Sequence, residues 1–166
     1  MGLFTKKKLP AWNPGTLGSI TQGKVMPVTE VKDEVFSQKM LGDGVAFLSE
    51  DGVVVSPCDG TVTAFFHTNH AIGLTTQDGA EVLIHIGLDT VKEGGRGFKG
   101  YVKEGDAVKR GQKLITFDKE VLEEKGYDLS IPMIISNIDA VENIKALMDG
   151  TVTTEDDVLA YSPVQE

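Results

Sequence analysis

The sequence predicts an all-β protein with a sandwich-like or barrel-like fold and only one or two very short helices. Short runs rich in valine, isoleucine, threonine and phenylalanine recur between turn-forming Gly, Asp, Asn and Pro residues, a spacing typical of such folds. The 19 glycines among 166 residues add to the turn-rich character. The expected strands are Val53–Val55, Thr61–Phe66, Ala71–Thr75, Val82–Ile86, Lys113–Phe117 and Met133–Ile135.

Two short segments favour a helix. The first, Lys119–Lys125, follows Asp118, a good N-cap, and precedes Gly126, a residue type that commonly ends helices. The second, Asp139–Leu147, is also short. Neither segment is long enough to change the fold class.

A Gly-Asp pair precedes an apolar strand twice, in "MLGDGVAF" (40–47) and in "KEGDAVKRGQKLITF" (103–117). Because glycine adopts positive φ and aspartate hydrogen-bonds nearby backbone, both pairs can form tight turns. The echo indicates either one supersecondary unit used twice or a common turn that occurs twice by chance.

The length predicts one domain with its own core. We expect a flexible N-terminal arm over residues 1–20 and a single domain over residues 21–166. Lys6–Lys8 could touch an anionic membrane surface, although Pro10 and Pro14 would interrupt an amphipathic helix there. The 25 acidic and 16 basic side chains give a net charge of −9, which opposes binding to nucleic acid and favours a partner with a basic face.

Cys58 is the only cysteine, so an internal disulfide is excluded. No basic or histidine neighbour in the sequence would lower its thiol pKa, and we expect a small buried apolar residue. A reducing compartment follows from this cysteine usage. No apolar run approaches the roughly 20 residues of a membrane span, and a cytoplasmic location is therefore expected.

Two histidines stand on either side of Asp78-Gly79, a strong signal for a two-residue hairpin turn. That turn places His85 opposite Ile72, which makes His70 its diagonal neighbour on the same face of the sheet. A turn at Gln77-Asp78 would place the two histidines directly opposite each other. Only a loop with an odd number of residues would send them to opposite faces.

This pair has the parts for phosphoryl transfer through phosphohistidine. A neutral imidazole can attack a phosphoryl group through one ring nitrogen when the other nitrogen carries the proton and is held by an acceptor. The Gly87 carbonyl is the candidate acceptor for His85, and Thr68 is placed to fix the tautomer of His70. His70 can then donate to the phosphoryl oxygens.

Two other interpretations of the histidines stay open. Each ring could be a buried residue with one satisfied hydrogen bond. A zinc site needs three or four ligands, and the HxH, HExxH and paired-cysteine spacings are all absent, so we expect no metal and no cofactor. The third histidine, His67, lies at odd spacing from His70 and is expected to point away from the pair as a structural or exposed residue.

Five sequence blocks carry a specific family resemblance: "VKDEVFSQKMLGDGVAF" (31–47), "VSPCDGTVTAFFHTNHAIGL" (55–74), "EVLIHIGLDTV" (81–91), "GFKGYVKEGDAVKRGQKLITFD" (97–118) and "IPMIISN" (131–137). The most specific feature is the pairing of Thr-Asn-His with apolar-His-apolar-Gly-apolar-Asp-Thr-Val. On these blocks the chain resembles the glucose-type enzyme IIA component of the bacterial phosphoenolpyruvate-dependent sugar phosphotransferase system.

The resemblance implies a duplicated hybrid motif of the β-sandwich type and a phosphotransferase component without a cofactor. His85 matches the histidine that accepts phosphate from the histidine-containing phosphocarrier protein and passes it to the IIB domain of a glucose-type sugar permease. His70 and Thr68 match the supporting histidine and the hydroxyl beside it. Members of the family also bind regulatory targets while unphosphorylated.

The same resemblance implies a rim for protein docking at Asp33, Val35 and Phe36, with Asp89 as an acidic residue flanking the site. An apolar rim around a histidine suits weak, fast exchange between proteins. Glu34 stands where the family often has an apolar residue, so the apolar patch is expected to be smaller and more acidic. The chain carries no IIB or IIC segment, and we expect a free-standing IIA that meets a separate permease.

Two further protein classes share parts of the pattern. "SPCDGTV" and "VKEGDAVKRGQKL" resemble the flanks of a biotinyl or lipoyl carrier domain, but no Met-Lys dipeptide lies between them. A zinc peptidase on a related hybrid-motif fold would need an HxH pattern. The glycine-rich "GGRGFKG" (94–100) lacks the GK[ST] of a nucleotide site and is expected to be a loop.

Overall fold

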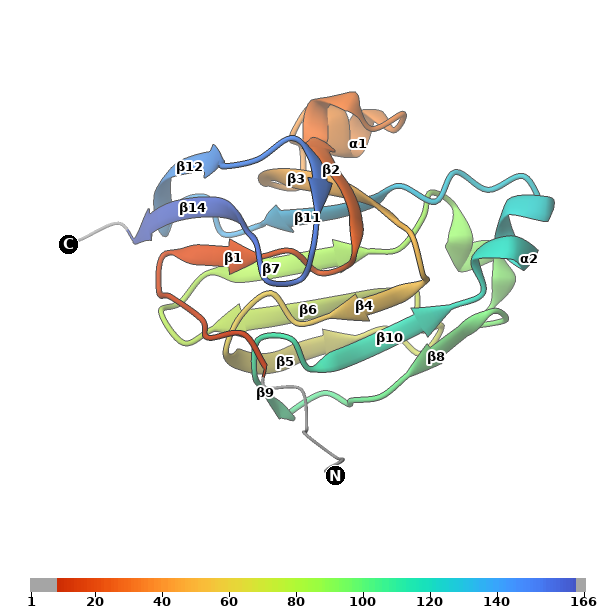
Figure 1. The fold of residues 1–166 in the computed structure, drawn as a ribbon, viewed down its shortest axis with the longest axis horizontal. Helices are drawn as coiled ribbons and strands as arrows, with labels where there is room; N and C mark the ends of the chain where they lie inside the picture. Colours follow the sequence, from red (N-terminus) through yellow and green to blue (C-terminus); the bar gives the residue numbers. More distant parts are fainter. Residues whose placement is uncertain (1–8, 164–166) are drawn as a thin grey trace, which may run out of the picture.

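The computed structural model describes residues 9–163 and confirms the all-β architecture (Figure 1). Two short helices, α1 (Glu34–Ser37) and α2 (Lys119–Glu124), and two 3₁₀ turns, η1 (Val28–Glu30) and η2 (Thr90–Glu93), accompany the strands. The strands are β1 (Thr16–Gly18), β2 (Gly23–Pro27), β3 (Asp43–Ser49), β4 (Val53–Val55), β5 (Gly60–Phe65), β6 (Ala71–Thr76), β7 (Glu81–His85), β8 (Phe98–Gly100), β9 (Ala107–Val108), β10 (Lys113–Phe117), β11 (Ile131–Ile135), β12 (Val141–Ala146), β13 (Gly150–Val152) and β14 (Asp157–Pro163).

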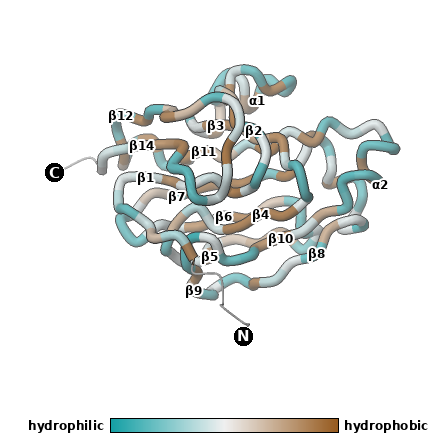
Figure 2. The backbone as a smooth tube through the Cα atoms, in the orientation of Figure 1, coloured by the Kyte–Doolittle hydropathy of each residue, from teal (hydrophilic) through white to brown (hydrophobic). Residues whose placement is uncertain are grey.

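The strands form one large sheet and two small ones. The large sheet has eight strands in the order β13-β2-β3-β11-β7-β6-β5-β9, and the small sheets have the orders β4-β10-β8 and β1-β14-β12. The main core lies between them, because Val54 and Leu114 of one small sheet and Leu159 of the other belong to the same buried cluster as Ile72 and Ile84 of the large sheet. Figure 2 shows the apolar residues along these strands and hydrophilic residues in many of the connections.

The opposite face of the large sheet is only partly covered. Val28 of η1 and Phe36 of α1 pack with Ala46 of β3 and Ile134 of β11 in a second buried cluster. Nearer the β5 edge the same face is hollow, with a cavity of about 370 Å³ lined by residues that include Gly73 of β6. The histidines lie at the ends of the strands beside this hollow face.

The ordered domain begins before the predicted boundary at residue 21. Strand β1 pairs antiparallel with β14, and Leu17 and Ile20 are both fully buried. The expectation of a flexible arm over residues 1–20 is therefore wrong for its second half, because apolar residues there are needed to close the core. Residues 1–8, with the lysine run proposed to touch membranes, lie outside the described residues.

The helix expectations had mixed outcomes. Helix α2 is confirmed: the Asp118 carboxylate accepts a hydrogen bond from the Val121 N–H at 3.2 Å, and Gly126 has a φ of +87°. The helix expected over 139–147 is wrong, because this segment forms β12 and pairs with β14. Helix α1 was not predicted.

Between residues 9 and 163, no helix is long and apolar enough to cross a membrane.

The two Gly-Asp pairs do not form the same turn. Gly105 has a φ of +95°, and the Lys103 N–H donates to the Asp106 carboxylate at 3.0 Å, which makes a tight turn. Asp43 instead is already the first residue of β3. The echo at 40–47 therefore marks the start of a strand and not a repeated turn.

Cys58 is fully buried, and burial raises the pKa of its thiol to about 12. This agrees with the expected packing role, since a thiol with such a pKa stays protonated and unreactive near neutral pH.

The Asp78 carboxylate connects the β6–β7 loop to strand β14 and to the segment before β1. It accepts hydrogen bonds from the Gly15 N–H at 2.8 Å, the Tyr161 hydroxyl at 2.6 Å and the Thr76 hydroxyl at 2.5 Å. Burial and the contact with Asp78 raise the pKa of Tyr161. One carboxylate thus satisfies three donors from β6, β14 and the segment before β1.

Removing this carboxylate should destabilise the protein strongly. We predict that Asp78→Ala lowers the free energy of unfolding by about 2 to 4 kcal/mol, because donors that are partly buried lose their acceptor. Urea unfolding followed by tryptophan fluorescence measures the change. Asp139→Ala, at an exposed loop position, is the matched control and should change the stability by less than about 0.5 kcal/mol.

Candidate functional site

The two predicted histidines meet at one end of the β6–β7 hairpin. His85 is the last residue of β7, and His70 directly precedes β6. The Ile86 N–H donates to the His70 carbonyl at 2.7 Å, which joins the two histidine segments through the backbone. The ring centroids are 5.0 Å apart, with an interplanar angle of 82°.

The hairpin that carries them has a different register from the predicted one. Ala71 pairs with His85, and Thr75 pairs with Glu81. The Thr76 N–H donates to the Ala80 carbonyl at 2.9 Å, so the loop holds the three residues 77–79. The two-residue turn at Asp78-Gly79 is therefore wrong. An odd loop would separate the histidines if both lay on regular strands.

A local break in the strand keeps the rings together. Asn69 has a φ of +57°, in the left-handed region, and residues 67–70 form a turn and bend before β6 begins. The side-chain alternation of β6 therefore does not extend to His70. His67 lies within this turn and is exposed.

His85 has its predicted acceptor. Its Nδ1 lies 2.8 Å from the Gly87 carbonyl oxygen. Because a carbonyl only accepts, Nδ1 carries the proton in the neutral ring and Nε2 has a free lone pair. Gly87 has a φ of +78°, and a Cβ there would lie 2.5 Å from Cγ2 of Thr90. Only glycine fits this position without strain.

His70 is held from two sides. The Thr68 hydroxyl is hydrogen-bonded to its Nδ1, and both residues are buried. The Phe66 ring stacks on the His70 ring at a centroid distance of 5.7 Å. The structure thus brings Thr68 and His70 together as expected, with Phe66 as an additional contact that spacing did not indicate.

Burial keeps both rings neutral. Desolvation, and secondarily the neighbouring His85 and His67, lower the pKa of His70 to about 4. Desolvation also lowers the pKa of His85, while the hydrogen bond to Gly87 and the charges of Asp33 and Asp89 act in the opposite direction. Near pH 7 both histidines are therefore uncharged, which is the state that a nucleophilic imidazole needs.

The proposed docking rim is divided between inner and outer positions. Phe36 is buried, with its ring 5.5 Å from the His85 ring, and forms a wall of the site. Asp33 caps α1 by accepting from the Val35 N–H at 2.9 Å. Val35 is 39% exposed. Asp89 has a left-handed backbone with a φ of +63° at the start of η2. Phe36 therefore cannot serve as an exposed rim residue.

Sequence reasoning missed several exposed apolar side chains near these elements. Phe66 is 47% exposed beside His70, and Val91 of η2 is 51% exposed. Met40 and Leu41, which follow α1, are 68% and 46% exposed. An apolar residue in a polar loop beside a candidate histidine was the sequence signal that could have predicted an exposed apolar side chain. Of these side chains, Phe66 is in contact with a ring of the pair.

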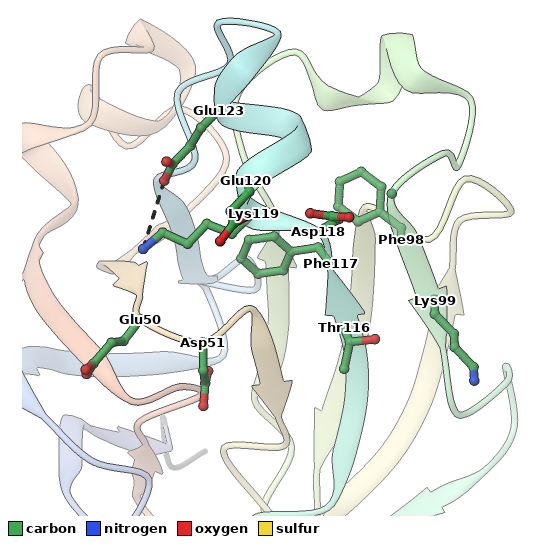
Figure 3. A pocket seen from close by; sticks show the side chains of 11 residues that line it. Glu50, Asp51, Phe98, Lys99, Thr116, Phe117, Asp118, Lys119, Glu120 and Glu123 are labelled. Atoms are coloured by element: carbon green, nitrogen blue, oxygen red, sulfur yellow. Dashed lines mark ion pairs between the residues drawn. The ribbon is translucent and has the colours of Figure 1, made fainter.

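A wide groove lies elsewhere on the molecule. It has a volume of about 770 Å³ and runs beside α2, β8 and β10. Figure 3 shows carboxylates such as Glu50, Asp51 and Asp118 along it, together with the Lys119–Glu123 ion pair at 3.9 Å. Neither histidine lines this groove. Within residues 9–163, no cluster of three or more His, Cys, Asp and Glu side chains is arranged to hold a metal ion.

Comparisons with known proteins agree with this geometry. The family model described as phosphoenolpyruvate-dependent sugar phosphotransferase system, EIIA 1, matches residues 15–141. A glucose-specific EIIA component of Bacillus anthracis is 48% identical over 141 residues, which cover 85% of this chain and 86% of that protein. A β-glucoside-specific EIIBCA component of Bacillus subtilis is 44% identical over 92% of this chain, which covers 26% of that longer protein.

A solved structure shows the same fold. The glucose permease IIA of Mycoplasma capricolum superposes with a TM-score of 0.82 at 32% sequence identity, covering 95% of this chain and 98% of that one. The family model spans most of the chain and includes both histidines. The chain belongs to the EIIA 1 family of the phosphoenolpyruvate-dependent sugar phosphotransferase system and is a phosphoryl-carrying component of sugar uptake.

Proposed function

We propose that Nε2 of His85 is the atom that carries the phosphoryl group. The observation that supports this most is the 2.8 Å hydrogen bond from Nδ1 to the Gly87 carbonyl, because it leaves Nε2 unprotonated at the half-buried end of β7. In the transfer, the Nε2 lone pair forms a bond to phosphorus while the bond from phosphorus to the donor nitrogen breaks. No proton needs to leave His85.

His70 is proposed to stabilise the phosphoryl oxygens during this step. If the Thr68 hydroxyl donates to Nδ1 of His70, the ring proton lies on Nε2 and becomes available to an oxygen of the phosphoryl group. A pKa of about 4 keeps this ring neutral. A fixed neutral donor supports transfer in both directions, because it does not bind the phosphoryl group as tightly as a cation would.

The proposed partners are the histidine-containing phosphocarrier protein as donor and the IIB domain of a glucose-type permease as acceptor. A IIB partner is supported by relatives in which IIA, IIB and IIC form one chain. Their names include both glucose and β-glucosides as sugars, and the sugar itself need not touch a IIA domain. We propose the cytoplasm as the location, which the single buried Cys58 favours.

Docking on the histidine face is proposed to combine apolar contact and charge. Any protein that exchanges phosphate with His85 must cover it, and a typical interface buries about 800 Å² on each partner. Val35, Phe66 and Val91 offer exposed apolar side chains near the site, and Asp33 and Asp89 offer negative charge. A partner with a basic, partly apolar face fits this surface. Regulatory targets could use the same face while His85 is unphosphorylated.

Incubation with phosphoenolpyruvate, enzyme I and the phosphocarrier protein tests the phosphorylated residue. We expect one acid-labile phosphoryl group by intact mass measurement, and none on His85→Gln, because glutamine lacks the nucleophilic nitrogen. His67→Gln, at an exposed position in the turn before β6, is the control for loss of a histidine and should be labelled normally. Labelling of His85→Gln would contradict the assignment.

The role of His70 predicts a different defect. His70→Gln should still accept one phosphoryl group but pass it to the IIB domain about tenfold or more slowly, because the transition state loses a positioned donor. Rapid mixing of phosphorylated protein with purified IIB domain measures this rate. Onward transfer at the wild-type rate would remove His70 from the mechanism.

The pKa of His70 also predicts a pH-dependent stability. In the unfolded chain this ring titrates near its ordinary pKa of 6.5, and in the folded protein near 4. Unfolding therefore takes up a proton between these values, so stability is full above pH 6.5 and falls as the pH drops toward 4. Urea unfolding at pH 7.5, 5.5 and 4.5 should show a steeper fall for the wild type than for His70→Gln; parallel curves would contradict the burial argument.

A further inference from the structure

Glu93 is a buried carboxylate that the phosphoryl relay does not use. It is 6% exposed at the end of η2. Nζ of Lys125 donates to its Oε1 at 2.5 Å, and the Tyr127 hydroxyl donates to its Oε2 at 2.6 Å. Both donors lie in the segment that connects α2 to β11. Glu93 therefore joins η2 to that connecting segment.

Both joined segments hold the backbone that follows His85. On one side, the Thr90 hydroxyl of η2 donates to the Ile86 carbonyl at 2.5 Å. On the other side, the Gly87 N–H donates to the Ser130 carbonyl at 3.0 Å, and the Leu88 N–H donates to the Asp128 carbonyl at 2.8 Å. The Gly87 carbonyl, which fixes the tautomer of His85, thus lies between two segments that Glu93 connects.

The glycine-rich loop that follows Glu93 lies next to Thr68, the residue that holds His70. Gly94, Gly95 and Gly97 all have positive φ, and glycine has more conformational freedom than any other residue. A Cβ at Gly95 would lie 3.6 Å from the Cα and the carbonyl oxygen of Thr68, so the two backbones are adjacent. A glycine-rich loop has few side chains of its own to fix its position, and Glu93 is the buried polar anchor at its start.

We propose that Glu93 is a positioning residue for both histidines. By holding η2 against the segment after α2, it fixes the Gly87 carbonyl that orients His85 and the glycine-rich loop that packs against Thr68. Glu93 acts through the backbone and does not touch the phosphoryl group. This inference rests on the proposed function where it concerns transfer rates, whereas its effect on the histidine tautomers is independent of phosphate.

The test compares Glu93→Ala with Glu93→Gln, which keeps the side-chain length and an oxygen acceptor for Tyr127. We expect Glu93→Ala to lower the rate of phosphoryl acceptance at saturating donor about tenfold with little change in KM, because the nucleophile is misplaced while the docking face remains. Nitrogen-15 NMR of the imidazoles should show His85 losing its single Nδ1–H tautomer. Glu93→Gln should restore most of both properties.

A matched control and a milder variant make the result decisive. Glu123→Gln removes the charge from an exposed ion pair with Lys119 and should leave the rate and the NMR spectrum unchanged. If Glu93→Ala folds and shows wild-type rate and tautomers, the positioning role is wrong and the residue is only structural. If Glu93→Ala does not fold, Tyr127→Phe replaces it, and unchanged His85 signals in that variant would overturn the proposal. Absence of phosphate on the wild type would instead refute the proposed function.

Discussion

The site depends on the antiparallel pairing of β6 and β7. The hydrogen bond from the Ile86 N–H to the His70 carbonyl lies at the end of this pairing, beyond the last regular residues of both strands. Ile72 and Ile84, paired across the two strands and fully buried, fix the ladder behind the histidines. The sheet therefore fixes the positions of the two rings. The backbone segments next to the histidines, which orient the rings, lie outside the strands and need not follow the side-chain alternation of a strand.

Opposing electrostatic effects set the state of His85. Burial favours the neutral ring, which is the state that the proposed nucleophile needs. Asp33 and Asp89 act against burial, and the same two negative charges disfavour a phosphoryl group once it is attached. A carrier must accept and release phosphate with similar ease. Under the role proposed for His85, burial serves acceptance and the two carboxylates serve release.

Local signals made much of the fold predictable, and non-local contacts account for the errors. Asp118 and Gly126 mark helix α2 within a few residues of each other, so its bounds could be predicted. Asp78 was interpreted as a turn residue, but its carboxylate binds Gly15 and Tyr161, both remote in the sequence, and the loop has three residues. In β12, Asn143 adopts a φ of +56° within an irregular pairing with β14, which no local helix propensity could indicate.

In the candidate site, too, local contacts were predictable and contacts between distant residues were not. Thr68 bonds His70, and His85 bonds Gly87, each across two residues, so these hydrogen bonds were predictable. Glu93 instead meets Lys125 and Tyr127 across 32 and 34 residues. This arrangement has a physical reason. Under the proposed function, two different proteins cover His85 in turn, so its own chain cannot enclose it. Its ring must therefore be oriented by contacts on the sides that no partner covers. Segments that are distant in the sequence supply those contacts.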